Sequence, residues 1–286
     1  MKNSRNHNSL FLLFLLFYCS ILVNDIAGQT NTAYPWLNQA SNIESIENRF
    51  PPPNGFTRTK VAPGSFAQWL RELPLLPAGA PIVDYQGKII KNANDSTYAA
   101  VVNYNIQNKK LEQCMDLIVR FRAEYLKSQQ KDDEIAFYLP VNFLLKWNDW
   151  KQGFRPHYRG IQVKLIKSNQ PDSSRQSFEQ YLWTVFYYSN TQTAYFNYPM
   201  VKLNDIQIGN FIVKKGSRGH AVLVVDIAIA SSGNKIALIG QGDTPARQFC
   251  LLNFKKNQPW FPLNPGDEYP PLPIRKKMHY EGLRRF

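Results

Sequence analysis

The chain has 286 residues, of which 44% are hydrophobic and 14% aromatic, so it can bury a complete core but cannot hold two large domains. It carries 34 basic and 21 acidic residues, which gives a net charge of +13. The basic residues are spread along the sequence, and only residues 275–277 and 284–285 form clusters. Because no basic stripe or nucleic-acid motif accompanies the charge, we expect no nucleic-acid partner. A basic face suits an anionic cell-envelope surface, and ordinary solubility is the alternative reason for the charge.

The first 28 residues have the order of a secretory signal peptide. Lys2 and Arg5 precede an apolar stretch at residues 10–23, and the small residues Ala27 and Gly28 follow it. We therefore expect cleavage near Gly28 and an exported chain, periplasmic or extracellular. The apolar stretch is short for a membrane-spanning helix, and an uncleaved anchor is the alternative.

Residues 29–60 read as a polar N-terminal extension. A short helix is expected around residues 43–49, and the breaker PPPNG follows at residues 51–55. We interpret this extension as a strap on the surface. Residues 61–286 then form a single domain.

The domain begins with short elements. Residues 65–73 (SFAQWLREL) have apolar side chains at helical spacing and end before Pro74, which predicts a helix. Two short strands around Gly87 are expected within residues 77–91. Residues 98–104 predict another strand.

The longest predicted helix covers residues 110–128, because its apolar side chains recur every three or four residues and form one face. Cys114 lies on that face, in the first turn or two. A thiol near a helix N-terminus feels the positive end of the helix dipole, which favours the nucleophilic thiolate. The competing interpretation is that Cys114 is a small buried residue of the core.

A strand is expected at residues 135–139 and a helix at residues 175–188. Between them, Trp147, Trp150 and Arg155 lie in a stretch dense in Trp, Gly and Arg. These three side chains are candidates for lining a carbohydrate or peptide groove, and core packing is the alternative for the aromatic ones.

Residues 205–242 predict three short strands, the last two joined as a hairpin by the turn SSGN at residues 231–234. His220 opens the second strand. If Ala230 pairs with Lys235, His220 shares a face with Gln241 and Asp243 on the next strand. An amide or carboxylate beside a histidine holds its ring in one tautomer for general-base chemistry.

The C-terminal part begins with a predicted strand at residues 247–254, which contains Cys250. The remaining residues, 257–286, are Pro-rich and basic, and we expect them to wrap the surface. Taken together, the elements predict an α+β fold in which helices pack on an antiparallel sheet.

The order of these features resembles that of the bacterial papain-like cell-wall hydrolases of the CHAP and NlpC kind. The matching positions are Cys114 at a helix start, residues 208–211 (IGNF) before a strand, residues 219–222 (GHAV) opening a strand, and Gln241 on the next strand. The resemblance implies a papain-like core, with the helix that bears the Cys packed on the sheet that bears the His.

That resemblance also implies a reaction. Cys114 would attack an amide carbonyl, His220 would act as the base, and Gln241, or failing it Asp243, would orient the ring. The implied substrates are cell-wall peptides or glycans, with no cofactor.

Over most of the exported chain the sequence also resembles an uncharacterised family of secreted bacterial proteins, the domain of unknown function 4846. The matching stretches are residues 70–75, 111–126, 150–155, 219–226, 241–246 and 283–286. This resemblance implies no particular activity.

Two further hypotheses remain open. The same fold can serve as a non-catalytic envelope or glycan-binding module, and Cys114 and Cys250 can form a disulfide in an oxidising compartment. We expect no metal site, because His157, His220 and His279 lack ligand-type spacing. Nothing in the sequence indicates an oligomeric state.

Overall fold

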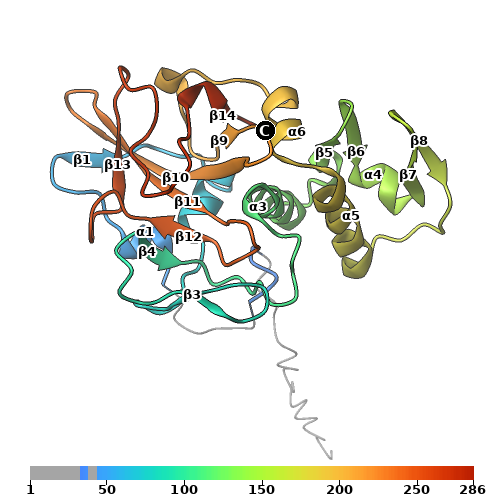
Figure 1. Ribbon diagram of the computed structural model, residues 1–286, viewed down its shortest axis with the longest axis horizontal. Helices are drawn as coiled ribbons and strands as arrows, with labels where there is room; N and C mark the ends of the chain where they lie inside the picture. Colours follow the sequence, from blue (N-terminus) through green and yellow to red (C-terminus); the bar gives the residue numbers. More distant parts are fainter. Residues whose placement is uncertain (1–32, 38–43) are drawn as a thin grey trace, which may run out of the picture.

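The computed structural model describes residues 33–37 and 44–286, and it has an α+β fold built on an antiparallel sheet. Figure 1 shows the sheet on one side of the molecule, the long helix α3 (Cys114–Ser128) beside it, and a group of short hairpins and helices beyond α3. The predicted signal peptide at residues 1–28 lies outside the described residues. Within residues 33–37 and 44–286, no helix is both long and apolar enough to cross a membrane.

Eight strands form the main sheet. Its hydrogen-bonded order is β14 (Leu283–Arg284), β9 (Phe211–Lys214), β10 (His220–Ala230), β11 (Lys235–Gln241), β12 (Cys250–Leu252) and β4 (Tyr98–Val101). Two more strands join it, β1 (Phe56–Arg58) on β10 and β13 (Trp260–Leu263) on β11. Three separate hairpins are β2 (Ile82–Val83) with β3 (Ile89–Lys91), β5 (Ala136–Leu139) with β6 (Phe143–Lys146), and β7 (Phe154–Arg159) with β8 (Gln162–Lys167).

The other helices are short, except for α5. They are α1 (Ile46–Arg49), α2 (Phe66–Arg71), α4 (Trp147–Lys151), α5 (Arg175–Tyr188) and α6 (Thr191–Asn197). The predicted helices near residues 43–49, 65–73 and 175–188 are therefore confirmed. The predicted long helix begins four residues later than expected, at Cys114 itself, with Gln113 as its N-cap.

The β10–β11 hairpin carries a bulge that sets the register at its far end. Ile229 pairs with Lys235 at the loop, one residue away from the predicted pairing of Ala230 with Lys235. A bulge between Val224 and Asp226 then shifts the ladder by one more residue. A shift of one residue would move the paired side chains to the other face, but two such shifts cancel. The prediction is therefore confirmed that His220 lies on the same face of the sheet as Gln241 and Asp243.

Both faces of the sheet are covered by hydrophobic core. One cluster includes alternate residues of β10, such as Ala221 and Leu223, together with the buried face of α3. The other includes Val222, Val224 and Cys250 on the opposite face. Because successive side chains of a strand point to opposite faces, His220 belongs to the face of Val222, away from the helix.

A segment near each end of the described chain contributes strands to this sheet, which corrects two predictions. The N-terminal extension was expected to be a strap, but its residues 56–58 form β1 and pair with β10. The residues after 257 were expected to wrap the surface, but they supply β13 and β14. Phe261 and Leu283 from this segment are fully buried, because both pack into the hydrophobic cluster on the face of Val222.

A buried ion-pair network joins α3 to α5. Arg120 is 2% exposed and lies 2.5 Å from a carboxylate oxygen of Glu112, 3.0 Å from Glu124 and 2.6 Å from Glu179. Glu112 comes two residues before Cys114, so the network also fixes the turn that leads into α3. Nη1 and Nη2 of Arg120 donate to the three carboxylates, whereas its Nε has no hydrogen-bond partner among the described residues. The opposite charges offset much of the cost of burying them.

Candidate functional site

The candidate site lies where β10 begins and β11 ends. His220 is the first residue of β10, and the tight turn before it requires a glycine at position 219. A Cβ atom there would lie 1.9 Å from Oγ1 of Thr191 and 2.9 Å from the carbonyl oxygen of Lys214. The polar turn at residues 215–219 therefore fixes the backbone position of His220 at the start of β10.

Gln241 holds the imidazole of His220. The side-chain oxygen Oε1 of Gln241 lies 2.6 Å from Nε2 of His220. Because an amide oxygen only accepts hydrogen bonds, Nε2 carries the proton and Nδ1 carries the lone pair. Burial lowers the pKa of His220 below its ordinary value, against the opposing effects of Gln241 and Asp243, so the ring is neutral near pH 7. A neutral ring with a free Nδ1 can accept a proton.

Asp243 lies on the other side of the ring. Its Oδ1 is 3.7 Å from Nδ1 of His220 and 3.5 Å from Nζ of Lys276, and its Oδ2 pairs with Arg247. Although burial acts in the opposite direction, Arg247 and His220 hold the pKa of Asp243 below its ordinary value. The carboxylate is therefore charged, and it forms ion pairs with two basic side chains rather than a hydrogen bond with the ring.

Cys114 is the first residue of α3 and packs against the same strand end. The backbone N–H of Ala221, the residue after His220, faces the Cys114 sulfur. Gly242 allows this approach, because a Cβ atom there would lie 2.6 Å from Cδ1 of Leu117 on α3. The hydroxyl of Thr244 donates a hydrogen bond of 2.8 Å to Oε1 of Gln113, which ties the segment after β11 to the helix start.

The thiol is closed off from solvent. Cys114 is 4% exposed, and burial, followed by the nearby Asp116 carboxylate, raises the pKa of its thiol to about 11. Cys114 does lie at a helix start, where the helix dipole should lower the pKa of its thiol. Desolvation by burial raises this pKa by more than the dipole lowers it. Cys114 and His220 approach the end of β10 from opposite faces of the sheet, and within residues 33–37 and 44–286 Nδ1 of His220 has no hydrogen-bond partner.

The two tryptophans that were candidates for a substrate groove lie in the core, which corrects that prediction. Trp147 is fully buried against Phe178 and Tyr181 of α5, and Trp150 is 4% exposed. The guanidinium of Arg155 stacks on the Trp150 ring at 3.8 Å and donates to backbone carbonyls. The two tryptophans pack α4 against α5, so they belong to the core and do not line a groove.

A cavity of about 570 Å³ opens on the His220 face of the sheet. Besides His220, Gln241 and Asp243, its lining includes Cys250, which was not predicted as a site residue. The pairing of Cys250 with Gln241 across β11 and β12 places it there. A cysteine on a strand adjacent to the strand that bears Gln241 was the available signal.

The disulfide between Cys114 and Cys250 is not formed. Both are free, buried thiols, and they belong to core clusters on opposite faces of the sheet. Burial raises the pKa of the Cys250 thiol to about 12. The structure thus offers two protonated thiols, one at the helix start and one in the cavity.

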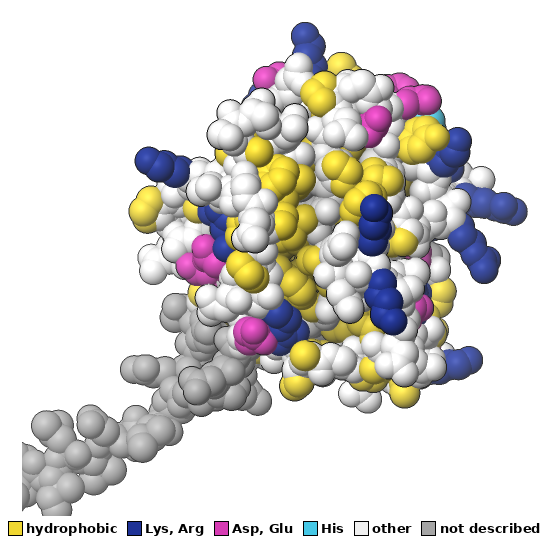
Figure 2. Space-filling view, turned by 90° about the vertical axis from the view of Figure 1, so that its left-hand side faces the viewer, with side chains coloured by type: hydrophobic (Ala, Val, Ile, Leu, Met, Phe, Trp, Pro, Cys, Tyr) yellow, Lys and Arg dark blue, Asp and Glu magenta, His cyan; other side chains and the backbone are white. Residues whose placement is uncertain are grey.

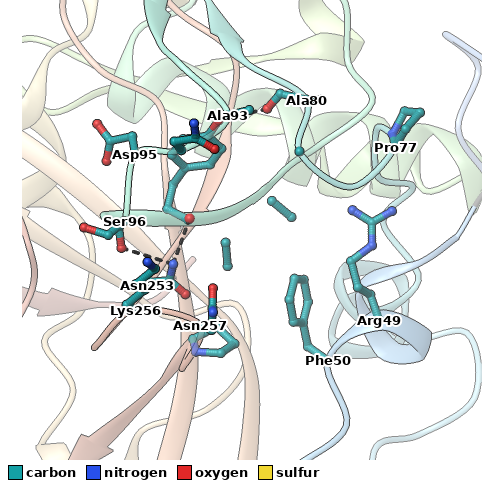
Figure 3. A pocket seen from close by; sticks show the side chains of 16 residues that line it. Arg49, Phe50, Pro77, Ala80, Ala93, Asp95, Ser96, Asn253, Lys256 and Asn257 are labelled. Carbon is teal, nitrogen blue, oxygen red and sulfur yellow. Dashed lines mark hydrogen bonds between the residues drawn. The ribbon is translucent and has the colours of Figure 1, made fainter.

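A second cavity, of about 540 Å³, lies along the outer strand β4. Figure 3 shows Arg49 and Phe50 on one side of it, and a polar group that includes Asp95 and Asn253 on the other. Asn253 is 4% exposed and donates to the carbonyl oxygens of Ser96 and Tyr98. Tyr98 lines both cavities and so forms part of the wall between them.

The surface charge is dispersed on the face seen in Figure 2. Lys and Arg side chains stand apart from one another there, around a band of hydrophobic side chains. On this face of the described chain, they form no continuous basic stripe of the kind that follows a nucleic-acid backbone.

These features define an α+β protein with a buried thiol at a helix start and a histidine–glutamine pair on the adjoining antiparallel sheet. The chain belongs to the family described as domain of unknown function (4846), whose model matches residues 46–273. That match begins at the first residue of α1 and extends past β13. No curated protein and no solved structure matches the chain.

Proposed function

We propose that the protein is a cysteine-dependent amidase or peptidase with a papain-like core, acting on amide bonds of exported cell-envelope polymers of the peptidoglycan type. The observation that carries the proposal is the 2.6 Å contact between Gln241 and Nε2 of His220. It leaves Nδ1 as the free base at the strand end where α3 presents Cys114. A cysteine, a histidine and a side-chain amide in these roles form the triad of papain-like proteases.

The proposed reaction starts from a neutral thiol and a neutral imidazole. As the Cys114 sulfur bonds to the carbonyl carbon, its proton passes to Nδ1 of His220 and the carbonyl π pair moves onto oxygen. Backbone N–H groups at the start of α3 stabilise this oxyanion. Cleavage of the C–N bond then takes the proton from His220 to the leaving amine. Water, deprotonated by His220, hydrolyses the thioester and restores the thiol.

This reaction requires the closed thiol to become accessible. The rim segment at residues 242–246 touches the helix start through Gly242 and through the Thr244–Gln113 hydrogen bond. Displacement of this segment by substrate would expose the Cys114 sulfur, and the side chain of His220 would also have to turn around the end of β10 for Nδ1 to reach it. In substrate-free enzymes, catalytic contacts are often longer than in the reacting complex.

The presence of two buried cysteines provides a matched test. Hydrolysis of purified cell-wall material should be lost in Cys114→Ala, because the nucleophile is removed, and in His220→Ala, because the base is removed. Cys250→Ala removes a second buried thiol, which lines the cavity beside His220 but takes no part in making or breaking bonds, so its hydrolysis should stay well above that of Cys114→Ala. Release of new amino groups measures the hydrolysis. Unchanged hydrolysis in Cys114→Ala, with loss in Cys250→Ala, would contradict the assignment of the nucleophile.

A second candidate function is a non-catalytic glycan-binding module, and the cavity in Figure 3 is the observation that favours it. Its lining combines the Phe50 ring with several amide, hydroxyl and charged side chains, a mixture suited to a ligand that is rich in hydroxyl groups. If neither the unaltered protein nor Cys114→Ala hydrolyses cell-wall material while both bind it equally, this function is favoured over the amidase.

A further inference from the structure

We propose that the cavity beside His220 binds an anionic group of the substrate, a carboxylate or a phosphate, and so selects substrates that carry such a group near the scissile amide. This inference rests on the proposed function, since it names the substrate class of the same site. Binding of the anionic group can nevertheless be measured without catalysis.

The charges around the cavity carry the inference. Four basic side chains line it: Lys91 from β3, Arg247 from the segment after β11, and Arg275 and Lys276 from the C-terminal part. They come from three separate parts of the sequence, so only the fold brings them together. Asp243 is the one acidic side chain in the lining.

The basic charge is only partly neutralised within the described protein. Asp243 is shared between Arg247 and Lys276, and Lys91 pairs with Asp95, just outside the lining, at 3.2 Å. Counting Asp95, four basic side chains face two carboxylates, which leaves an excess of two positive charges. Arg275 is exposed and forms no ion pair with any described residue. A bound anion would offset this excess through charge-assisted hydrogen bonds.

The shape of the cavity indicates what else the ligand contains. Its remaining walls are largely apolar, and they include the buried side chains of Ile82, Tyr98 and Leu252. A volume of about 570 Å³ is within the range of small-molecule sites, and larger than one carboxylate needs. The arrangement therefore fits a ligand with an uncharged body and an anionic end.

The same cavity contains the proposed base. His220 and Gln241 line it together with the basic side chains, so an anion held by Arg275 and Lys276 lies in the cavity that His220 also lines. A substrate anchored there by its anionic end would place a neighbouring amide close to the end of β10. Selection of the substrate and its orientation would thus use the same contacts.

The test measures binding by the full chain carrying Cys114→Ala, so that no hydrolysis intervenes. Calorimetry compares N-acetyl-dialanine, which has a free carboxylate, with its C-terminal amide. We expect the acid to bind about tenfold more tightly, the effect of about 1.4 kcal/mol from a charge-assisted hydrogen bond. Adding Arg275→Gln and Lys276→Gln should abolish this preference. Adding Lys277→Gln, an exposed neighbour outside the lining, should leave it unchanged.

Equal binding of the acid and the amide, or a preference that survives Arg275→Gln with Lys276→Gln, overturns the inference. Competition by inorganic phosphate separates the two ligand chemistries: displacement of the acid extends the site to phosphate-bearing ligands, and no displacement restricts it to carboxylates. The outcomes for the two proposals are distinct. If the protein prefers the acid but the unaltered chain hydrolyses no cell-wall material, the anion site is supported and the amidase is rejected. If the unaltered chain hydrolyses this material but shows no preference for the acid, the amidase is supported and the anion site is rejected.

Discussion

At the level of single residues, the central feature is a histidine that is buried, neutral and held at one nitrogen only. His220 is 1% exposed, and Gln241 satisfies Nε2 while Nδ1 has no partner within the described chain. A buried polar atom without a partner is costly, and such atoms are concentrated at functional positions. The arrangement therefore has a price in stability that depends on pH.

The pH dependence of folding should reveal this histidine. Burial lowers the pKa of His220 in the folded protein below its ordinary value near 6.5, despite the nearby Asp243, and Lys276 and Arg247 act in the same direction as burial. As the pH falls below about 6.5, the unfolded chain binds a proton that the folded chain does not, so the free energy of unfolding should decrease. The slope from this group is at most about 1.4 kcal/mol per pH unit.

Urea unfolding between pH 7.5 and 5.5 measures this slope. His220→Gln should flatten it, because glutamine does not titrate. His157→Gln, which alters an exposed histidine on β7, should keep the slope of the unaltered protein. An equal slope in His220→Gln and in the unaltered protein would show that other groups cause the dependence.

At the level of elements, the bulge in β10 determines which face of the sheet carries the site. Asp226 lies at the bulge with its side chain fully buried, and its two oxygens lie 2.7 Å from Arg58 of β1 and 2.5 Å from Arg71 of α2. Through these two ion pairs, β1 and α2 are both bound to β10 at its bulge. A one-residue slip in a ladder moves every following side chain to the other face, so this anchor protects the His220–Gln241 pairing.

Removing the charge of Asp226 should therefore destabilise the fold. Asp226→Asn leaves two largely buried guanidinium groups without their carboxylate, and we expect a loss of about 3–5 kcal/mol in the free energy of unfolding. Glu134→Gln breaks the exposed Lys131–Glu134 pair and a 3.9 Å contact with the partly buried Arg122, and it should change the free energy of unfolding by less than about 1 kcal/mol. Urea denaturation of both variants measures the difference. Equal midpoints would mean that the buried ion pairs contribute no more than the exposed one.

The sequence predicts this part of the fold only to the extent that the signals are local. The helix at residues 175–188 and the turn at residues 231–234 follow from apolar periodicity and turn-forming residues. The face shared by His220 and Gln241 was predicted correctly, but from a register that the bulge at Asp226 then altered by compensating shifts. The bulge depends on ion pairs to residues more than 150 positions away in the sequence, which no local pattern reveals.

The site residues differ in the same way. The positions of Cys114 at the start of a helix and of Gln241 on a strand could be predicted, because local apolar patterns mark both elements. The burial of Trp147 was not recognisable, because an aromatic side chain reads the same whether it lines a groove or fills a core. The prediction that residues 257–286 wrap the surface was wrong for a related reason. Their prolines and basic residues are typical of surface coil, whereas β13 and β14 form only by pairing with β11 and β9, which are distant in the sequence.

At the level of the whole molecule, α3 lies between the main sheet and the group formed by α4, α5 and their hairpins (Figure 1). A single hydrophobic cluster runs through all three, and its members extend along the sequence from Tyr34 to Trp260. The C-terminus completes it, since Phe286 contacts Phe137 of β5, Tyr198 and Phe211 of β9. The helix that presents Cys114 is thus held from both sides, and the end of the chain closes the structure around it.

The C-terminal strand should consequently contribute to global stability rather than only cover the surface. Leu283 is fully buried in β14, paired with Ile212 of β9, so Leu283→Ala removes core contacts and leaves a cavity. We expect a loss of about 2–3 kcal/mol, at the low end for buried leucines because the strand lies at the edge of the sheet. For a chain of this size, that loss lowers the thermal midpoint by about 2–4 °C per kcal/mol. Arg285→Ala, at an exposed neighbouring position, is the matched control and should melt with the unaltered protein, as followed by circular dichroism. If Leu283→Ala melts at the same temperature as Arg285→Ala, β14 adds nothing to the core, and the closing segment would be the surface wrapping that its composition predicts.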